Sequence, residues 1–219
     1  MKICFLTKKD KPGVKEAITF TKGIDEDIDV YCGEIKDPFP KDITKRYYDL
    51  LISYLSPWIV PKEALKKTIK WNINFHSGPP EYPGIGCFNF AIYESSENFG
   101  ATAHLMNQTV DTGKIIGVRR FPITDRETVK SLSIKTYDAQ LSLYIEVMNY
   151  IISNNELPKC DEKWQRKPFK RIDLEELARI NSNMSKQDMK KRIRATYFPE
   201  KPAPFIELHG HRFEYNPDR

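Results

Sequence analysis

The segment Ile69–His76 alternates strictly between apolar and polar residues. This period of two is typical of a β-strand with one buried face. The apolar face comprises Trp71, Ile73 and Phe75, and the polar face comprises Asn72, Asn74 and His76. An amide and an imidazole therefore lie side by side at the carboxyl end of a strand, where open α/β sheets bind their ligands. The loop that follows, residues 77–86, is too rich in proline and glycine to be a helix or a strand.

Strand and helix patterns alternate through the first two thirds of the chain. The predicted strands are Lys2–Thr7, Ile28–Gly33, Asp49–Leu55, Ile69–His76, Gly100–Met106 and Lys114–Ile123. The predicted helices are Val14–Lys22, Asp42–Arg46, Lys62–Lys67, Cys87–Glu94 and Arg126–Ser153. Such alternation predicts an α/β fold, with a doubly wound, mostly parallel sheet of the Rossmann type.

The last third of the chain has a different pattern. Residues 1–155 are expected to form the catalytic domain, and residues 156–219 a short C-terminal extension. Asp173 and Ser185 are candidate caps for helices over Leu174–Asn181 and Lys186–Arg194. The stretch Phe205–Tyr215 reads as a β-hairpin that turns at His209 and Gly210. Because an isolated hairpin is marginally stable, this one is expected to pack on its own domain, on a second subunit, or on both.

Composition limits the class of protein. The 219 residues suit one main domain, and 35 Lys and Arg against 30 Asp and Glu give a net charge of only +5. No long basic run is present, which argues against nucleic acid as a partner. The apolar stretches are strand-sized, so no membrane span is expected, and the N-terminus does not read as a signal peptide. Four scattered cysteines without a CxxC pair indicate a reducing cytoplasm, with no zinc site and no disulfide framework.

Four motifs occur in a specific order and spacing. They are Asn74-Phe75-His76, the turn Pro80–Gly84, the stretch Phe99–His104, and Asp111-Thr112-Gly113, whose aspartate follows His76 by 35 positions. From Met1 to Ile152 this pattern resembles the folate-dependent formyltransferase family. That family includes glycinamide ribonucleotide transformylase, methionyl-tRNA formyltransferase and the sugar N-formyltransferases.

Two further features resemble the nucleotide-sugar branch of this family. The commonest family form continues from the histidine into Pro-Ser-Leu-Leu-Pro, whereas this chain has Ser77-Gly78-Pro79-Pro80. The ending Arg194–Pro199 and the hairpin are also similar to the tail of the sugar enzymes, and no counterpart of the larger RNA-binding domain is seen. The resemblance implies transfer of a formyl group from N10-formyltetrahydrofolate to the amino group of a nucleotide-linked amino-dideoxy sugar, such as one carried on dTDP or GDP. It also implies that the formylated sugar is used in surface polysaccharide synthesis and that the enzyme is a homodimer. Formylation of a purine precursor or of aminoacyl-tRNA, or folate binding without turnover, remain as alternatives.

The chemistry of formyl transfer suits the three central residues. Attack of an amine on a formyl group creates an oxyanion, and the amine must lose a proton. Asn74 can donate its amide N–H to the oxyanion. His76 can take or relay the proton, or act as a second donor. Asp111 can orient His76 and stabilise its charge.

The resemblance also implies binding residues. Those expected at the folate are Tyr54, Leu55, Pro57, Trp58, Ile59, Gln108, Thr109 and Val110. Those expected at the acceptor are Lys8, Lys9, Gly78, Pro79, Tyr82 and Phe88. Lys8 and Lys9 lie in the first strand-to-helix loop, a natural position for a phosphate, although solvated surface lysines are an equal alternative. Tyr82 and Phe88 are either substrate contacts or core residues.

Three other features favour ordinary structural roles. His104 lies in an alternating strand and is expected to be a packed, hydrogen-bonded histidine rather than a catalyst. His209 and His211 flank a turn that would separate them, so no metal site is expected. Gly84-x-Gly86 is half of a dinucleotide fingerprint and follows the wrong strand for one.

Overall fold

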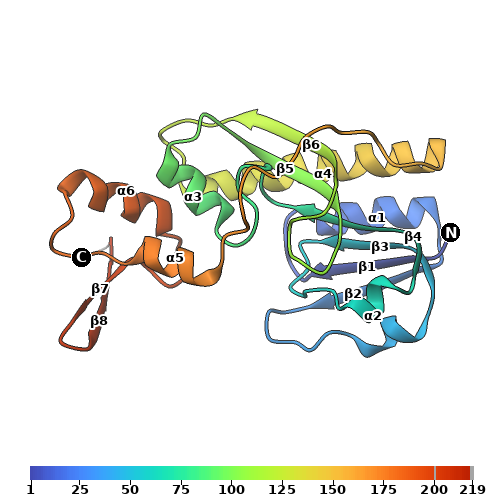
Figure 1. The fold of residues 1–219 in the computed structure, drawn as a ribbon, viewed down its shortest axis with the longest axis horizontal. Helices are drawn as coiled ribbons and strands as arrows, with labels where there is room; N and C mark the ends of the chain where they lie inside the picture. The colour runs from blue at the N-terminus through green and yellow to red at the C-terminus, as the bar shows by residue number, and fades with distance from the viewer. Residues whose placement is uncertain (200, 218–219) are drawn as a thin grey trace.

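The computed structural model of the chain describes residues 1–199 and 201–217 and contains a six-stranded sheet and a separate hairpin (Figure 1). The strands are β1 (Ile3–Lys8), β2 (Ile28–Gly33), β3 (Tyr48–Tyr54), β4 (Thr68–His76), β5 (Asn98–Leu105), β6 (Ile115–Pro122), β7 (Phe205–Leu208) and β8 (His211–Glu214). The helices are α1 (Val14–Ile24), the 3-10 helix η1 (Lys41–Lys45), α2 (Lys62–Leu65), α3 (Cys87–Glu94), α4 (Val129–Asn154), α5 (Arg171–Ala178) and α6 (Lys186–Thr196). Each predicted element is present, with boundaries shifted by a few residues.

The sheet has the order β2-β1-β3-β4-β5-β6. Strands β1 to β4 pair in parallel, and β5 and β6 are antiparallel additions. The predicted Rossmann-like, mostly parallel sheet is thus confirmed. The strand order reverses between β1 and β3, since α1 leads from β1 to one side and α2 leads from β3 to the other. Such a reversal opens a crevice at the carboxyl ends of the strands.

Both faces of the sheet are covered. Helices α1 and α4 lie along one face, where Tyr144 packs among the rings of Phe5, Tyr54 and Phe75 (Figure 1). Tyr54, expected at the folate, is fully buried in this cluster, because its position on β3 turns it toward α4. On the other face, η1 and α2 cover Cys4, Leu6 and Leu51. Within the described residues, no helix is long and apolar enough to cross a membrane.

The C-terminal extension packs on the catalytic domain instead of standing apart. After α4, the chain runs back over the loop that follows β4, where Phe169 exchanges backbone hydrogen bonds with Pro83 and Ile85. Helices α5 and α6 then join α3 in a common core that includes Leu177 and Ala195. Helix α4 ends at Asn154, and Asn155 after it has a positive φ of 50°.

Of the two predicted caps for the C-terminal helices, one is confirmed and the other is wrong. The Ser185 side chain accepts the backbone N–H of Asp188 and caps α6, as predicted. Asp173 does not cap α5, which begins three residues earlier than expected. Its carboxylate lies inside the first turn and accepts the N–H of Lys170, because a carboxylate at that position can reach back to the helix start.

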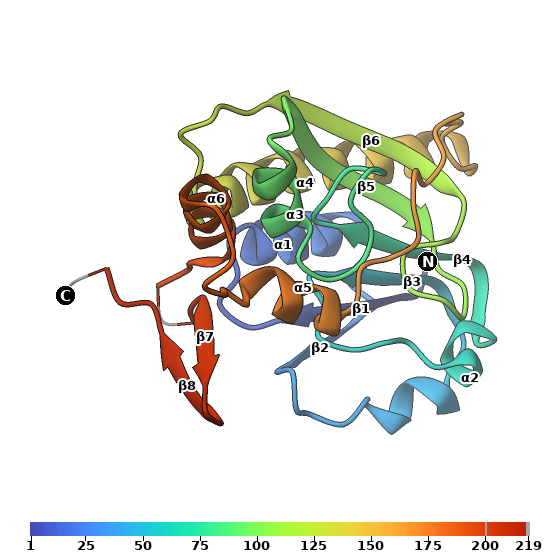
Figure 2. The same ribbon diagram turned by 60° about the vertical axis from the view of Figure 1, so that its left-hand side comes forward.

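The predicted hairpin is confirmed, including its turn. His209 and Gly210 have positive φ angles of 51° and 80°, as a two-residue turn between antiparallel strands requires. Figures 1 and 2 show that the hairpin projects from the molecule beyond α5. Phe205 at its base is buried, whereas Leu208 and Phe213 near its tip are 50% and 55% exposed.

Candidate active site

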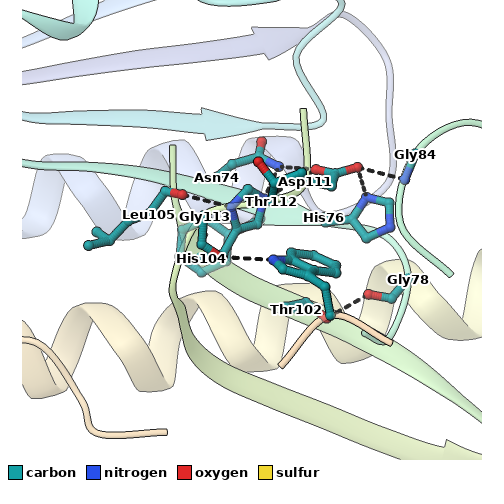
Figure 3. A network of polar contacts seen from close by, with 12 residues as sticks. Asn74, His76, Gly78, Gly84, Thr102, His104, Leu105, Asp111, Thr112 and Gly113 are labelled. Carbon is teal, nitrogen blue, oxygen red and sulfur yellow. Dashed lines mark hydrogen bonds and ion pairs between the residues drawn. The ribbon is translucent and has the colours of Figure 1, made fainter. Parts of the chain in front are cut away.

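Four polar side chains meet at the carboxyl end of β4 (Figure 3). Asn74 and His76 point from β4, and the antiparallel register pairs Asn74 with His104 on β5. Asp111 comes from the loop between β5 and β6. The structure therefore brings together the three predicted central residues, although they are separated by up to 37 positions along the chain.

The Asp111 carboxylate is the hub of this cluster and is only 5% exposed. Oδ2 accepts the backbone N–H of Gly84 at 2.8 Å and lies 3.2 Å from His76 Nδ1. Oδ1 lies 3.2 Å from His104 Nε2 and 3.4 Å from the Asn74 amide nitrogen. Each carboxylate oxygen is thus surrounded by nitrogen atoms.

These neighbours decide the charge of Asp111. Burial by itself raises the pKa of the carboxyl group, but His76, His104 and the Gly84 N–H favour the ionised form more strongly. The pKa of Asp111 consequently lies well below its usual value, and the group is a fixed negative charge beneath the site.

His76 lies between two acceptors. Its Nε2 donates to the backbone carbonyl of Tyr82 at 2.9 Å, and its Nδ1 faces Asp111. A carbonyl and a carboxylate both accept hydrogen bonds, so both contacts are favourable only when the ring carries a proton on each nitrogen. Of the roles open to His76, this geometry favours that of a positively charged donor.

His104 is a packed, hydrogen-bonded histidine, as predicted. It is 2% exposed, and its Nδ1 donates to the carbonyl of Leu105 at 2.9 Å. The sequence pattern did not predict that its Nε2 lies 3.0 Å from the amide nitrogen of Asn74, inside the cluster. Only the antiparallel pairing of β4 with β5 creates this contact.

Trp164 of the C-terminal extension is a second missed residue. Its indole N–H donates to the carbonyl of Gly113 at 2.8 Å. Its ring meets those of His104 and His76 edge to face, at centroid distances of 5.1 and 5.9 Å. Because Trp164 lies in a polar, loop-like stretch, nothing in its local sequence indicates that it packs against the site.

The cluster opens into a cavity of about 550 Å³ at the ends of β3 and β4. Its polar floor includes the three predicted central residues, Asn74, His76 and Asp111. Six of the eight residues expected at the folate also line it: Leu55, Pro57, Trp58, Ile59, Thr109 and Val110. Tyr54 and Gln108 do not. Lining residues that the sequence pattern did not indicate include Ile85, Met106, Asn107 and Arg171.

None of the six residues expected at the acceptor lines this cavity. Lys8 pairs with Glu34 at 3.3 Å, and Lys9 is exposed. Gly78 and Pro79 are buried, and the Gly78 carbonyl accepts the Thr102 hydroxyl at 2.7 Å.

The two aromatic residues expected at the acceptor have core contacts. Tyr82 is 4% exposed and donates its hydroxyl to Glu94, and Phe88 packs on Phe99. Tyr82 contributes to the site only through its backbone carbonyl. Side-chain size and polarity alone do not distinguish a wall residue from a core residue here.

Comparisons with known proteins agree with this site. The sequence model described as formyl transferase matches residues 42–148, which include the Asn74, His76 and Asp111 motifs. The chain is 27% identical over 170 residues to the methionyl-tRNA formyltransferase of Pseudoalteromonas translucida, covering 77% of this chain and 52% of that protein. It thus spans about half the length of the curated relatives it matches.

Solved structures share the fold over almost the whole chain. A sugar N-formyltransferase from Shewanella superimposes with a TM-score of 0.77 at 17% identity, covering 98% of this chain and 96% of that one. An N-formyltransferase from Helicobacter canadensis, in complex with folinic acid and dTDP-3-aminofucose, superimposes with a TM-score of 0.75 at 19% identity, covering 96% and 85%. The Asn-x-His and Asp-x-Gly motifs, which the fold joins in one cluster, both lie within the part of the chain that matches the formyl transferase family model.

Proposed function

We propose that the protein transfers the formyl group of N10-formyltetrahydrofolate to the amino group of a nucleotide-linked amino-dideoxy sugar. The observation that carries this proposal is the cluster of Asn74, His76 and Asp111 at the floor of a cavity with an apolar wall. Catalytic roles for these three residues are part of the proposal.

The polar floor suits the charge changes of formyl transfer. N10-formyltetrahydrofolate supplies a formyl carbon whose oxygen gains negative charge when the amine attacks. The Asn74 amide and a positively charged His76 are donors for that oxygen, and one such donor contributes about 10²–10³ in rate. Asp111 orients His76 and offers a negative charge that stabilises a protonated imidazole. Overall, a bond forms between the amine and the formyl carbon, the bond from that carbon to N10 breaks, and a proton passes from the amine to N10.

The position of His76 adds a condition to this mechanism. Its Nε2 already donates to the Tyr82 carbonyl. A bound formyl oxygen therefore has to compete with this carbonyl, or the ring has to rotate about its side-chain bonds. In the first arrangement the ring keeps its place, with Nδ1 3.2 Å from the Asp111 carboxylate.

The cavity also suits a folate. Its volume of about 550 Å³ is within the range of small-molecule sites, and Leu55, Pro57 and Trp58 offer apolar surface to a flat ring. Thr109 and Val110 lie in the loop that carries Asp111, so their backbone groups are available to the polar edge of a pterin.

Several observations favour a sugar acceptor over tRNA. The likeness to the Shewanella sugar enzyme extends through the C-terminal extension, over 98% of this chain and 96% of that one. The mild net charge of +5 is also a weak basis for binding RNA. A folate-binding protein without turnover would not need the complete set of Asn74, His76 and Asp111.

We further propose that the protein acts in the cytoplasm as a homodimer and supplies a formylated sugar for surface polysaccharide synthesis. Support for the dimer comes from the hairpin, whose exposed Leu208 and Phe213 lie on short strands that project from the molecule and whose exposed Tyr215 follows β8. Such an apolar, two-stranded edge favours pairing with a second copy.

The decisive experiment is a formylation assay. The protein is incubated with N10-formyltetrahydrofolate and a panel of dTDP- and GDP-linked 3-amino and 4-amino sugars, and products are analysed by mass spectrometry. We expect one sugar to gain a formyl group. Glycinamide ribonucleotide and methionyl-tRNA test the alternative acceptors, and the His76→Ala variant controls for uncatalysed transfer. Formylation of either alternative acceptor in place of all sugars would contradict the proposal.

A further inference from the structure

Gln140 is a fully buried amide on α4 that takes no part in the mechanism above. Most of the buried side chains of α4 are apolar, and Leu143, Tyr144 and Val147 pack in the main core. An amide in such surroundings costs free energy unless both of its ends are hydrogen-bonded. The partners of Gln140 therefore indicate why an amide is placed there.

The two ends of this amide are bonded to the two chain neighbours of His76. Nε2 of Gln140 donates to the carbonyl of Phe75 at 2.8 Å, and Oε1 accepts the hydroxyl of Ser77 at 2.7 Å. His76 is the last residue of β4, and β3 pairs with β4 only as far as Phe75. One side chain of α4 thus holds the backbone on both sides of His76, at the point where a neighbouring strand has ended.

Further contacts fix the residues that follow His76. The carbonyl of Ser77 accepts the thiol of Cys87 at 3.1 Å, and the carbonyl of Gly78 accepts the hydroxyl of Thr102 at 2.7 Å. The backbone also lies close to the imidazole, because a β-carbon added at Gly78 would lie 2.7 Å from His76 Nε2. A small displacement of this segment therefore displaces the imidazole.

The position of His76 has little tolerance. Its ring contacts the Tyr82 carbonyl at 2.9 Å and the Asp111 carboxylate at 3.2 Å, and both groups belong to other segments of the chain. A misplacement of about 1 Å in a catalytic group can cost on the order of 10²-fold in rate. Restraint of the backbone at the end of β4 consequently bears on the reaction as well as on the stability of the fold.

We propose that Gln140 is a positioning residue, which acts through the backbone of Phe75 and Ser77 to hold His76 in place for formyl transfer. This inference rests on the proposed function. Gln140 does not line the cavity, so its effect on the rate passes through His76 and not through contact with folate or acceptor. A role limited to stabilising the fold is the alternative that the experiment has to exclude.

The test compares Gln140→Met with Thr136→Val in the full-length protein. Gln140→Met keeps the length of the side chain and removes both hydrogen bonds. Thr136 is equally buried one turn earlier on α4, and its hydroxyl donates to the Leu132 carbonyl of its own helix, so Thr136→Val is the matched control. With the acceptor that the formylation assay identifies, we expect kcat to fall at least about 10-fold in Gln140→Met with KM for N10-formyltetrahydrofolate unchanged, and neither to change in Thr136→Val.

A double-variant cycle separates positioning from stability. If Gln140 acts through His76, Gln140→Met should lower kcat by less than about 2-fold in the His76→Ala background. An equal fall in both backgrounds would overturn the inference, because Gln140 would then act independently of His76. Ser77→Ala, which loses one of the two hydrogen bonds, should show a smaller fall with the same dependence on His76, and it decides the matter if Gln140→Met does not fold.

Histidine ring signals test the inference without formyl transfer. The chain has four histidines, so ¹⁵N-histidine labelling gives few signals, and His76→Ala identifies those of His76 by NMR. We expect the His76 signals to move in Gln140→Met and Ser77→Ala, and not in Thr136→Val. Unchanged His76 signals in both variants would overturn the inference while leaving formyl transfer intact. Absence of formyl transfer by the wild type, with His76 signals that depend on Gln140, would overturn only the proposed function.

Discussion

At the scale of single residues, Asp111 determines the state of the site. Its buried carboxylate contacts Asn74, His76, His104 and the Gly84 backbone together. Its carboxylate lies 3.2 Å from His76 Nδ1, so the imidazole is oriented before any ligand arrives. Removing Asp111 entirely would disturb four contacts at once, which makes Asp111→Asn a better probe than Asp111→Ala.

His76→Ala tests the proposed catalytic role directly. We expect kcat to fall by at least about 10²-fold, because the charged donor at the floor of the cavity is lost. Circular dichroism should show a folded protein, since the β4 backbone pairs are unaffected. His211→Ala, at an exposed hairpin histidine, is the control. Near-wild-type turnover in His76→Ala would remove the assignment.

Asp111→Asn is expected to destabilise the protein in a pH-dependent way. Because folding lowers the pKa of Asp111, its charge stabilises the native state above the carboxyl's unfolded pKa of about 3.9, and this stabilisation is lost as the pH falls through the lower folded pKa. Loss of one partner of a buried ion pair costs about 3 kcal/mol. Urea unfolding should show this difference from pH 7 to about pH 4, and a smaller one in stronger acid. A stability difference that grows toward low pH would contradict the predicted direction of this pH dependence.

Trp164 is expected to act as a positioning residue for the two imidazoles. In Trp164→Leu, kcat should fall several-fold with little change in KM, because the rings of His76 and His104 lose their shared support while the cavity wall is intact. Trp164→Phe should recover part of the loss, since it keeps an aromatic edge. The pH dependence of kcat should shift in Trp164→Leu and not in Trp71→Phe, the control on the far side of β4. An unchanged pH profile of kcat in Trp164→Leu would show that Trp164 has only a packing role.

At the scale of elements, the hairpin has two parts with different roles. Its base is fixed to the chain's own body, because Phe205 is buried and accepts the N–H of Ile180. Its tip exposes apolar side chains that the described residues do not cover. Cutting the chain after Arg194 would therefore also remove a core residue, and substitutions at the tip are the sharper test.

The double variant Leu208→Glu, Phe213→Glu is expected to be a folded monomer. Two like charges on an apolar interface oppose self-association, while Phe205 still anchors the hairpin. Light scattering on the wild type should give a dimer, and so should Ile35→Glu, which places one glutamate at a residue 66% exposed elsewhere. A monomeric wild type, or a dimeric double variant, would show that the hairpin is not the dimer interface.

At the scale of the whole molecule, the sheet, the loops and the extension act as one unit. The strands supply the floor of the cavity, the loop after β5 supplies one wall, and Arg171 from the extension closes its edge. Ligand binding should consequently stabilise the entire fold and not one domain alone.

Folinic acid is expected to raise the melting temperature. At a ligand concentration 100 times Kd, selective binding to the native state contributes about 2.7 kcal/mol, which corresponds to roughly 5–10 °C for a chain of this size. Differential scanning fluorimetry measures the shift, and p-aminobenzoylglutamate, which lacks the pterin, is the chemical control. A melting temperature that does not change at saturating folinic acid would count against the folate site.

The sequence by itself determined the local structure of this protein. Alternation over Ile69–His76, the proline and glycine of the following loop, and the turn at His209 and Gly210 act through neighbouring residues, and all appear as predicted. The motif order also identified Asn74, His76 and Asp111 as a set. The cap of α5 was misplaced because Asp173 can satisfy the same N–H from inside the helix.

Only the tertiary structure decided which distant residues meet. His104 enters the site through the antiparallel addition of β5, and Trp164 and Arg171 enter it because the chain after α4 runs back over the catalytic domain. Tyr54, in contrast, turns into the core. Periodicity and turn chemistry depend on residues a few positions apart, so they can be read from the chain. Strand order and the path of a long connection depend on which arrangement of all the helices and strands buries the most apolar surface. No local sequence pattern encodes that arrangement.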